Sequence, residues 1–368
     1  MRKKFLKILI IMNIFLAGCW DQQPLVDKTI VNGISFDLTD EGKIHATVRD
    51  LILKSTGGGQ FEVADELVHA ERPSLAGLSI DVNSKTAGQV DYSQANILLI
   101  GDELAKKGIQ QVLDPFYRGK NSSITSKVVI TNGKAEEIIS SEIKKSPIAF
   151  YILKLMESAV SETLIPDENV FTVWTKILSP GKDIIVPYVK LEESKIVIDG
   201  VALFNGNKFS GTTLSKEQSS LLLLLLDDLN KTNTMSPILN QDSKEQYISF
   251  ATRKLKRNME IKVDEKSGNI NAKIDLNIQV EVNTIQQDLR DNLKIKKLNQ
   301  EISKELTKQA KEVIDLLLKA NCDVFGIGME ISNTHPDLWK KMNWDEEYKN
   351  VQIEPKVNVK IIKTGNLF

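Results

Sequence analysis

Apolar and polar residues alternate along Ile270–Val282, where every second residue is apolar and the residues between are polar or charged. Strict alternation indicates a β-strand with one buried face and one face in water. Met259, Ile261 and Val263 repeat the pattern, and Lys266-Ser267-Gly268-Asn269 has the composition of a hairpin turn. These residues therefore predict a long antiparallel hairpin.

A helical period follows the hairpin. The apolar residues of this predicted helix share one stripe and the charged residues lie away from it. The stripe comprises Leu298, Ile302, Leu306, Ala310, Val313 and Leu317. A last strand is expected over 351–361, where Pro355 falls in the apolar register and is typical of an edge or a bulge. The pattern predicts an α+β unit, a C-terminal antiparallel sheet with a long helix packed on one face.

Short strand and helix patterns alternate through the first half of the chain, which predicts a mixed α/β region. Strands are expected near 30–36, 44–53, 95–100 and 123–131, and a flexible loop at 55–60. Helices are expected near 74–84, 102–113, 135–143 and 147–164, the second of them with Asp102 as its N-cap. A hairpin over 195–212 then precedes a helix whose capping box is Ser215 and Gln218. Residues 230–245 have the composition of a linker.

We therefore predict a multi-domain mixed α/β ectodomain with three parts. They are an N-terminal mixed α/β domain (19–190), a small middle domain and linker (191–250) and a C-terminal α+β domain (251–368). Residues 1–18 precede them and have a different pattern, a basic head followed by an apolar run that is too short for the roughly 20 residues of a membrane span.

Such a basic and then apolar start is typical of a secretory signal. Here it ends in Leu16-Ala17-Gly18-Cys19 rather than in a common A-x-A-like site. This ending has the form of a bacterial lipobox, which directs a diacylglycerol onto the cysteine and cleavage before it. Cys19 is therefore the predicted lipid attachment residue and the first residue of the mature protein. Two acyl chains provide a stable membrane anchor.

Removing residues 1–18 also removes four basic residues and leaves 44 Lys+Arg against 49 Asp+Glu, a formal charge of −5. This balance argues against nucleic acid as a partner. Of the two cysteines, Cys19 would carry lipid, so Cys322 has no intramolecular disulfide partner and is expected to pack as a small hydrophobic residue.

Motifs for catalysis or metal binding are weak. The three histidines, His45, His69 and His335, lack the spacing of a zinc motif, and a zinc site would need ligands gathered from all three domains. No Gly-x-Ser-x-Gly elbow is present. In the segment 333–339, Asn333 or Thr334 can cap a helix and Pro336 fits its first turn. This pattern favours a capped helix whose Trp339, together with Trp344, covers a core, over a sugar-stacking site. We expect no catalytic residues, no cofactor and no metal.

Several motifs, taken in order, resemble the Ger(x)C family, the lipoprotein C subunits of nutrient germinant receptors in bacterial spores. They are Cys19-Trp20-Asp21, Ile100-Gly101-Asp102-Glu103-Leu104-Ala105, Gly200-Val201-Ala202-Leu203-Phe204, and Asp323-Val324-Phe325-Gly326-Ile327-Gly328 with His335-Pro336, Trp339 and Trp344. The sequence departs from the family pattern at Gln22-Gln23-Pro24 and Lys120-Asn121, where acidic residues are expected. The likeness covers nearly the whole mature chain.

The resemblance implies a non-catalytic protein that is lipid-anchored on the outer surface of the spore inner membrane. It also implies two integral-membrane partners, the A and B type subunits of the same receptor; contact of this subunit with the nutrient is not implied. Two other classes of protein could also be anchored in this way. A lipid-anchored solute-binding protein of a transporter would need two lobes of repeated β-α units around a cleft, and a cell-wall hydrolase would need a carboxylate or metal constellation.

Overall fold

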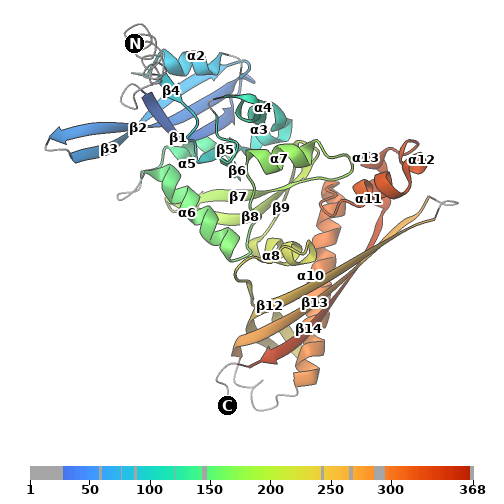
Figure 1. The fold of residues 1–368 in the computed structure, drawn as a ribbon. Coiled ribbons are helices and arrows are strands. Elements are labelled where there is room, and N and C mark those ends of the chain that lie inside the picture. Colours follow the sequence, from blue (N-terminus) through green and yellow to red (C-terminus); the bar gives the residue numbers. More distant parts are fainter. Residues whose placement is uncertain are drawn as a thin grey trace, which may run out of the picture.

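The computed structural model describes residues 28–57, 60–75, 77–86, 89–120, 122–142, 147–241, 244–264, 268–285 and 295–364. Within these residues the chain forms a nine-stranded sheet and a five-stranded sheet with helices packed on both (Figure 1). The predicted α+β, multi-domain fold class is therefore confirmed.

The nine-stranded sheet is mixed. Its order is β3-β2-β1-β5-β6-β7-β8-β9, with β4 paired to β1. The strands β1, β5, β6 and β7 run parallel to one another, and antiparallel pairs flank them on both sides. The bounds are β1 Lys28–Leu38, β2 Ile44–Gly57, β3 Gln60–Arg72, β4 Gln89–Asp91, β5 Ile97–Gly101, β6 Lys127–Thr131, β7 Ile185–Glu192, β8 Lys195–Asn205 and β9 Lys208–Leu214.

Helices cover both faces of this sheet because successive side chains of its central strands point to opposite sides. Ile97, Leu99 and Val129 pack with α5 and α6, whereas Leu98 and Ile100 pack with α2, α3, α4 and α7. The bounds are α2 Leu78–Asn83, α3 Asp102–Lys107, α4 Gln110–Arg118, α5 Ala135–Ile139, α6 Ile148–Ser161, α7 Val170–Ile177 and α8 Lys216–Leu225. The capping box of Ser215 and Gln218 at the start of α8 is confirmed.

Three local expectations differ from the structure. The helix expected over 102–113 is two helices, α3 and α4, separated at Gly108, whose φ of +128° lies outside helical geometry. The N-cap of α3 is Gly101. The flexible loop expected at 55–60 is mostly strand, because β2 continues to Gly57 and β3 begins at Gln60; Gly58 and Gly59 lie outside the described residues.

The sheet pairing crosses the predicted boundary at residue 190. The strands β8 and β9, expected in a separate middle domain (191–250), continue the first sheet through the antiparallel pair β7–β8. The linker expected at 230–245 instead contains β10 Thr234–Met235 and β11 Ile238–Gln241, both paired with β12. The exact division of the chain into three domains therefore stays a prediction.

The five-stranded sheet and one long helix form the C-terminal unit. The alternating residues of β13 and the predicted apolar stripe of α10 are buried in one shared core, as expected. That core also includes the leucines of α8 and side chains of α6, so it is continuous with one face of the first sheet. The bounds are β12 Lys244–Val263, β13 Ile270–Ile285, α10 Ile295–Ala320, α11 Ile327–Thr334, α12 Pro336–Trp339, α13 Trp344–Glu347, the 3-10 helix η2 Tyr348–Asn350 and β14 Gln352–Lys363.

The C-terminal sheet is mixed rather than wholly antiparallel. The predicted hairpin β12–β13 is antiparallel, but β14 pairs in parallel with β13. As Pro355 suggested, β14 is an edge strand. Its outward N–H groups are satisfied by polar side chains of α10: Val357 donates to Thr307, Val359 to Ser303 and Ile361 to Asn299, over 2.8–3.0 Å. The helix thereby protects the edge against pairing with another chain.

An unpaired acid is buried in the first sheet. Asp50 on β2 is 1% exposed, and neither of its carboxylate oxygens has a hydrogen-bond partner. Burial, followed by the nearby Glu66 charge, raises the pKa of Asp50 to about 7. Because an ionised carboxylate is poorly solvated there, Asp50 holds its proton to a higher pH than an exposed aspartate does.

The free energy of unfolding should therefore depend on pH through Asp50. Its pKa is raised by folding, so its contribution is present at low pH and is lost as the pH rises through about 7. Lowering the pH from 8 to 6 should stabilise the wild type by about 1 kcal/mol more than the Asp50→Asn variant. Urea unfolding of both proteins at the two pH values measures this, and equal pH responses would contradict it.

Candidate functional site

The family-like segment 323–328 lies where the first sheet meets the C-terminal unit, a region we call the junction. Asp183, just before β7, connects the first sheet to the C-terminal unit at this junction. Its Oδ2 accepts the N–H of Asp323 at 2.7 Å and its Oδ1 accepts the N–H of Gly206 at 2.6 Å. The N–H of Asp183 donates in turn to the carbonyl of Asp323 at 2.9 Å. Burial raises the pKa of Asp183.

Asp323 is the second carboxylate of the junction and is 1% exposed. It accepts the N–H groups of Ile327 at 3.0 Å and Gly328 at 2.8 Å, at the start of α11, and Nε1–H of Trp344 at 3.2 Å. Burial raises its pKa to about 6 in spite of these donors. The carboxylate therefore connects the end of α10, the first turn of α11 and the tryptophan of α13.

Two glycines allow the backbones to approach at the junction. Gly181 has a φ of +68°, and a Cβ atom there would lie 2.4 Å from the carbonyl carbon of Gly328. A Cβ atom on Gly328 would lie 2.5 Å from the ring of Trp344. The N–H of Met329 donates to the carbonyl of Gly181 at 2.8 Å. A larger side chain at either position would force the two sides apart.

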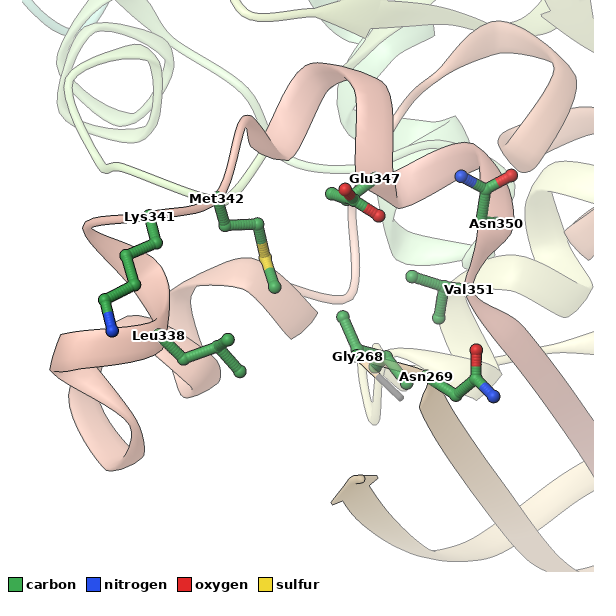
Figure 2. A pocket seen from close by; sticks show the side chains of 9 residues that line it. Gly268, Asn269, Leu338, Lys341, Met342, Glu347, Asn350 and Val351 are labelled. Atoms are coloured by element: carbon green, nitrogen blue, oxygen red, sulfur yellow. The ribbon is translucent and has the colours of Figure 1, made fainter. Parts of the chain in front are cut away.

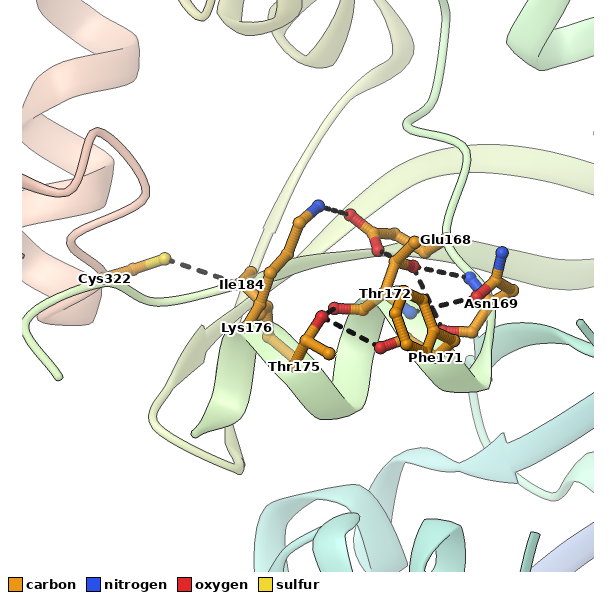
Figure 3. Close-up of polar contacts among 8 residues, drawn as sticks. All are labelled: Glu168, Asn169, Phe171, Thr172, Thr175, Lys176, Ile184 and Cys322. Carbon is orange, nitrogen blue, oxygen red and sulfur yellow. Dashed lines mark hydrogen bonds and ion pairs between the residues drawn. The ribbon is translucent and has the colours of Figure 1, made fainter. Parts of the chain in front are cut away.

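Cys322 is fully buried beside these residues, as its predicted role as a small hydrophobic residue requires. Its Sγ lies 3.7 Å from the carbonyl oxygen of Ile184 (Figure 3). The carbonyl oxygen of Cys322 accepts the hydroxyl of Tyr348 at 3.0 Å. Burial raises the pKa of the thiol well above its usual value. A protonated, inaccessible thiol is a poor nucleophile, so Cys322 serves packing.

A charged cleft of about 230 Å³ lies next to the junction. Figure 3 shows the carboxylate of Glu168 between the ammonium group of Lys176 and the hydroxyl of Thr172. The Thr172 hydroxyl donates to Oε2 of Glu168 at 2.6 Å. Lys182 and Asp228 also line the cleft, and burial lowers the pKa of Lys182 and raises that of Asp228. The cleft therefore presents both positively and negatively charged side chains where the first sheet meets the C-terminal unit.

A second pocket, of about 360 Å³, lies at the tip of the β12–β13 hairpin. Figure 2 shows Leu338, Lys341 and Met342 on one side of it, with Gly268 and Asn269 of the hairpin and Val351 on the other. Its wall mixes apolar side chains with the charged side chains of Lys341 and Glu347.

The lipobox residues Leu16, Ala17 and Gly18 and the lipid attachment residue Cys19 lie outside the described residues, so they stay predictions.

The segment 333–339 behaves as expected in part. Trp339 and Trp344 pack on the core with ring centroids 5.7 Å apart. The N-cap of α12, however, is His335 rather than Asn333 or Thr334.

The expectation that any zinc site would need ligands from all three domains is wrong. His45 on β2 and His69 on β3 are neighbours in one sheet, with stacked rings 5.7 Å apart, and Glu136 of α5 contacts both. Sequence analysis missed this because 60–72 was not recognised as a strand. The charges at Asp65-Glu66 interrupt its alternation, although Val68 and Ala70 are buried as on a regular strand.

No helix in the described part of the chain combines the length and the hydrophobicity that a membrane crossing requires.

The carboxylates of Asp183 and Asp323 accept hydrogen bonds from backbone and indole N–H groups at the junction. This use of the two carboxylates is structural.

Comparison with known proteins gives consistent matches along the chain. Residues 21–191 match the family model described as spore germination protein N-terminal domain, and residues 199–365 match spore germination B3/GerAC like, C-terminal. The spore germination protein GerQC of Bacillus cereus is 24% identical, covering 97% of this chain and 98% of that protein. The spore germination protein KC of Bacillus subtilis is 21% identical, covering 99% and 96%.

Among solved structures, the crystal structure of the GerBC protein matches with a TM-score of 0.58 and 19% identity. It covers 93% of this chain and 100% of that chain. At this identity the likeness shows a shared fold. The two family models meet between residues 191 and 199, that is, within the β7–β8 hairpin of the first sheet.

Proposed function

The chain belongs to the Ger(x)C family of spore germination proteins, and from this premise we propose that it is the lipid-anchored subunit of a nutrient germinant receptor. It acts with integral-membrane subunits of the A and B type on the outer surface of the spore inner membrane. The observation that carries the proposal is the match of two spore germination family models, which together cover 21–191 and 199–365.

The anchor is supported by the order of residues at the start of the chain. Residues 1–18 have the basic and then apolar pattern of an export signal, and Leu16-Ala17-Gly18 stand directly before Cys19. A diacylglycerol on Cys19 would hold the folded body at the membrane, next to the partners that span it.

A non-catalytic role is supported by the use of the reactive side chains at the junction. Asp183 and Asp323 bind backbone N–H groups, and the thiol of Cys322 is buried. We propose that the junction holds the first sheet and the C-terminal unit together as one rigid body. A partner that binds one of them would then also shift the position of the other.

Affinity capture from detergent-solubilised spore membranes tests this function. A tagged chain should bring down membrane-spanning receptor subunits, which an untagged strain grown in parallel should not yield. Recovery of transporter ATPases in their place would contradict the proposal and favour the solute-binding alternative. Hydrolysis of peptidoglycan by the purified chain would contradict the absence of catalysis.

A further inference from the structure

Two histidines and a glutamate converge at the β3 end of the first sheet, far from the junction. Glu136 Oε1 lies 3.4 Å from His45 Nε2 and 3.4 Å from His69 Nδ1. One ligand atom from each of the three residues lies within 4.8 Å of the other two. The residues belong to three elements, β2, β3 and α5, so the cluster is a product of the fold rather than of a local sequence motif.

The strand register places the two histidines together. In the β2–β3 ladder Thr47 is opposite His69, and His45 is opposite Glu71. His45 and His69 are therefore diagonal neighbours on one face, a separation that long aromatic side chains bridge. The hydroxyl of Thr47 lies between them, 3.3 Å from His45 Nε2 and 3.2 Å from His69 Nδ1.

The third residue is held in place from the adjacent strand. Asp37 on β1, which is opposite His45, accepts the N–H groups of Ala135 at 2.7 Å and Glu136 at 2.8 Å. These two bonds fix the first turn of α5 against the sheet. The backbone of Glu136 is thus positioned before any ligand arrives, which lowers the cost of ordering a site.

The two distances from Glu136 to the imidazoles suit ligands of one metal ion better than direct hydrogen bonds. Good N–H···O hydrogen bonds are about 2.7–3.2 Å long, and the two contacts of Glu136 with the imidazoles are longer. Zinc bonds of about 2.0–2.2 Å to nitrogen and oxygen place neighbouring ligands of a tetrahedron roughly 3.3–3.6 Å apart. The two distances from Glu136 Oε1 fall in this range, and the two imidazole nitrogens lie within 4.8 Å of each other.

We propose that His45, His69 and Glu136 bind a divalent transition-metal ion, with Zn²⁺ as the best fit to two imidazoles and one carboxylate. The three ligands leave one coordination position open. The side chains of His45, Glu136 and His69 are 21%, 35% and 46% exposed, so the ion can enter from solvent. Bound there, it joins the edge strand β3 to β2 and α5 and braces this end of the sheet.

The test is metal titration of the full-length chain, purified in detergent and freed of metal with a chelator. We expect saturable binding of one Zn²⁺ per chain. Each of His45→Asn, His69→Asn and Glu136→Gln should weaken binding by at least about 10-fold, since even the loss of a residue that only supports a ligand typically costs 10–100-fold. The matched control is His335→Asn, because this third histidine lies in the C-terminal unit and contacts Thr334; it should bind Zn²⁺ like the wild type.

Co²⁺ provides a second readout that needs no variant. The wild type loaded with Co²⁺ should show the visible d–d absorption of a tetrahedral site without the near-ultraviolet thiolate band that binding at Cys322 would produce. Absence of saturable binding, a thiolate band, or unchanged affinity in both histidine variants would overturn the proposal. Thermal melting of each variant without metal checks that it is folded.

Discussion

Replacing Cys19 by alanine is expected to release the protein from the membrane fraction and to abolish the nutrient response of spores that depend on it. The substitution removes the sulfur to which the diacylglycerol would be attached. The variant therefore loses the membrane hold that the two acyl chains of the diacylglycerol would supply. Fractionation of spore extracts and germination assays measure the two effects.

The control for this variant is the chain's other cysteine. Cys322→Ala removes a buried sulfur atom but leaves the predicted anchor in place, so the protein should remain in the membrane fraction. A Cys19→Ala protein that stayed in the membrane fraction, in spores that germinated normally, would show that the anchor is not needed.

Replacing Asp323 by alanine should cause the largest loss of stability at the junction. It leaves the N–H groups of Ile327 and Gly328 and the indole N–H of Trp344 without their acceptor in a buried place. An unsatisfied buried donor typically costs about 1–3 kcal/mol, so the free energy of unfolding should fall by at least about 3 kcal/mol. Urea unfolding, followed by tryptophan fluorescence, reports this loss because Trp344 is one of the affected groups.

Asp337→Ala is the matched control, because this aspartate belongs to the same C-terminal unit and its side chain is 91% exposed. Surface substitutions of this kind usually change stability by less than about 0.5 kcal/mol. If Asp323→Ala and Asp337→Ala unfolded at the same urea concentration, the carboxylate of Asp323 would not be what connects α10, α11 and Trp344.

The C-terminal unit was predictable because its pattern is regular. Alternation in β13 and the apolar stripe of α10 are two halves of one core, and both are buried as expected. Alternation does not determine strand direction, so the parallel pairing of β14 was not predicted. That pairing depends on α10 carrying the chain back along the sheet, and on Asn299, Ser303 and Thr307 receiving the outer N–H groups of β14.

The junction and the histidine cluster were beyond sequence reasoning for a different reason. Asp183 and Asp323 are 140 residues apart, and the sequence contains no spacing signal that connects them. Likewise, His45 and His69 meet only through the register of β2 and β3. Short elements such as β10 and β11 were also missed, because a composition rich in Asn, Thr and Ser is typical of linkers. Here the residues of both elements pair with the neighbouring strand β12.

Mass spectrometry of the protein isolated from spore membranes tests the anchoring of this subunit most directly. The account predicts that the mature chain begins at Cys19 and that its amino-terminal peptide carries the added mass of a diacylglycerol on the sulfur. A mature chain that retained residues 1–18, or one that began at Cys19 with a free thiol, would contradict it.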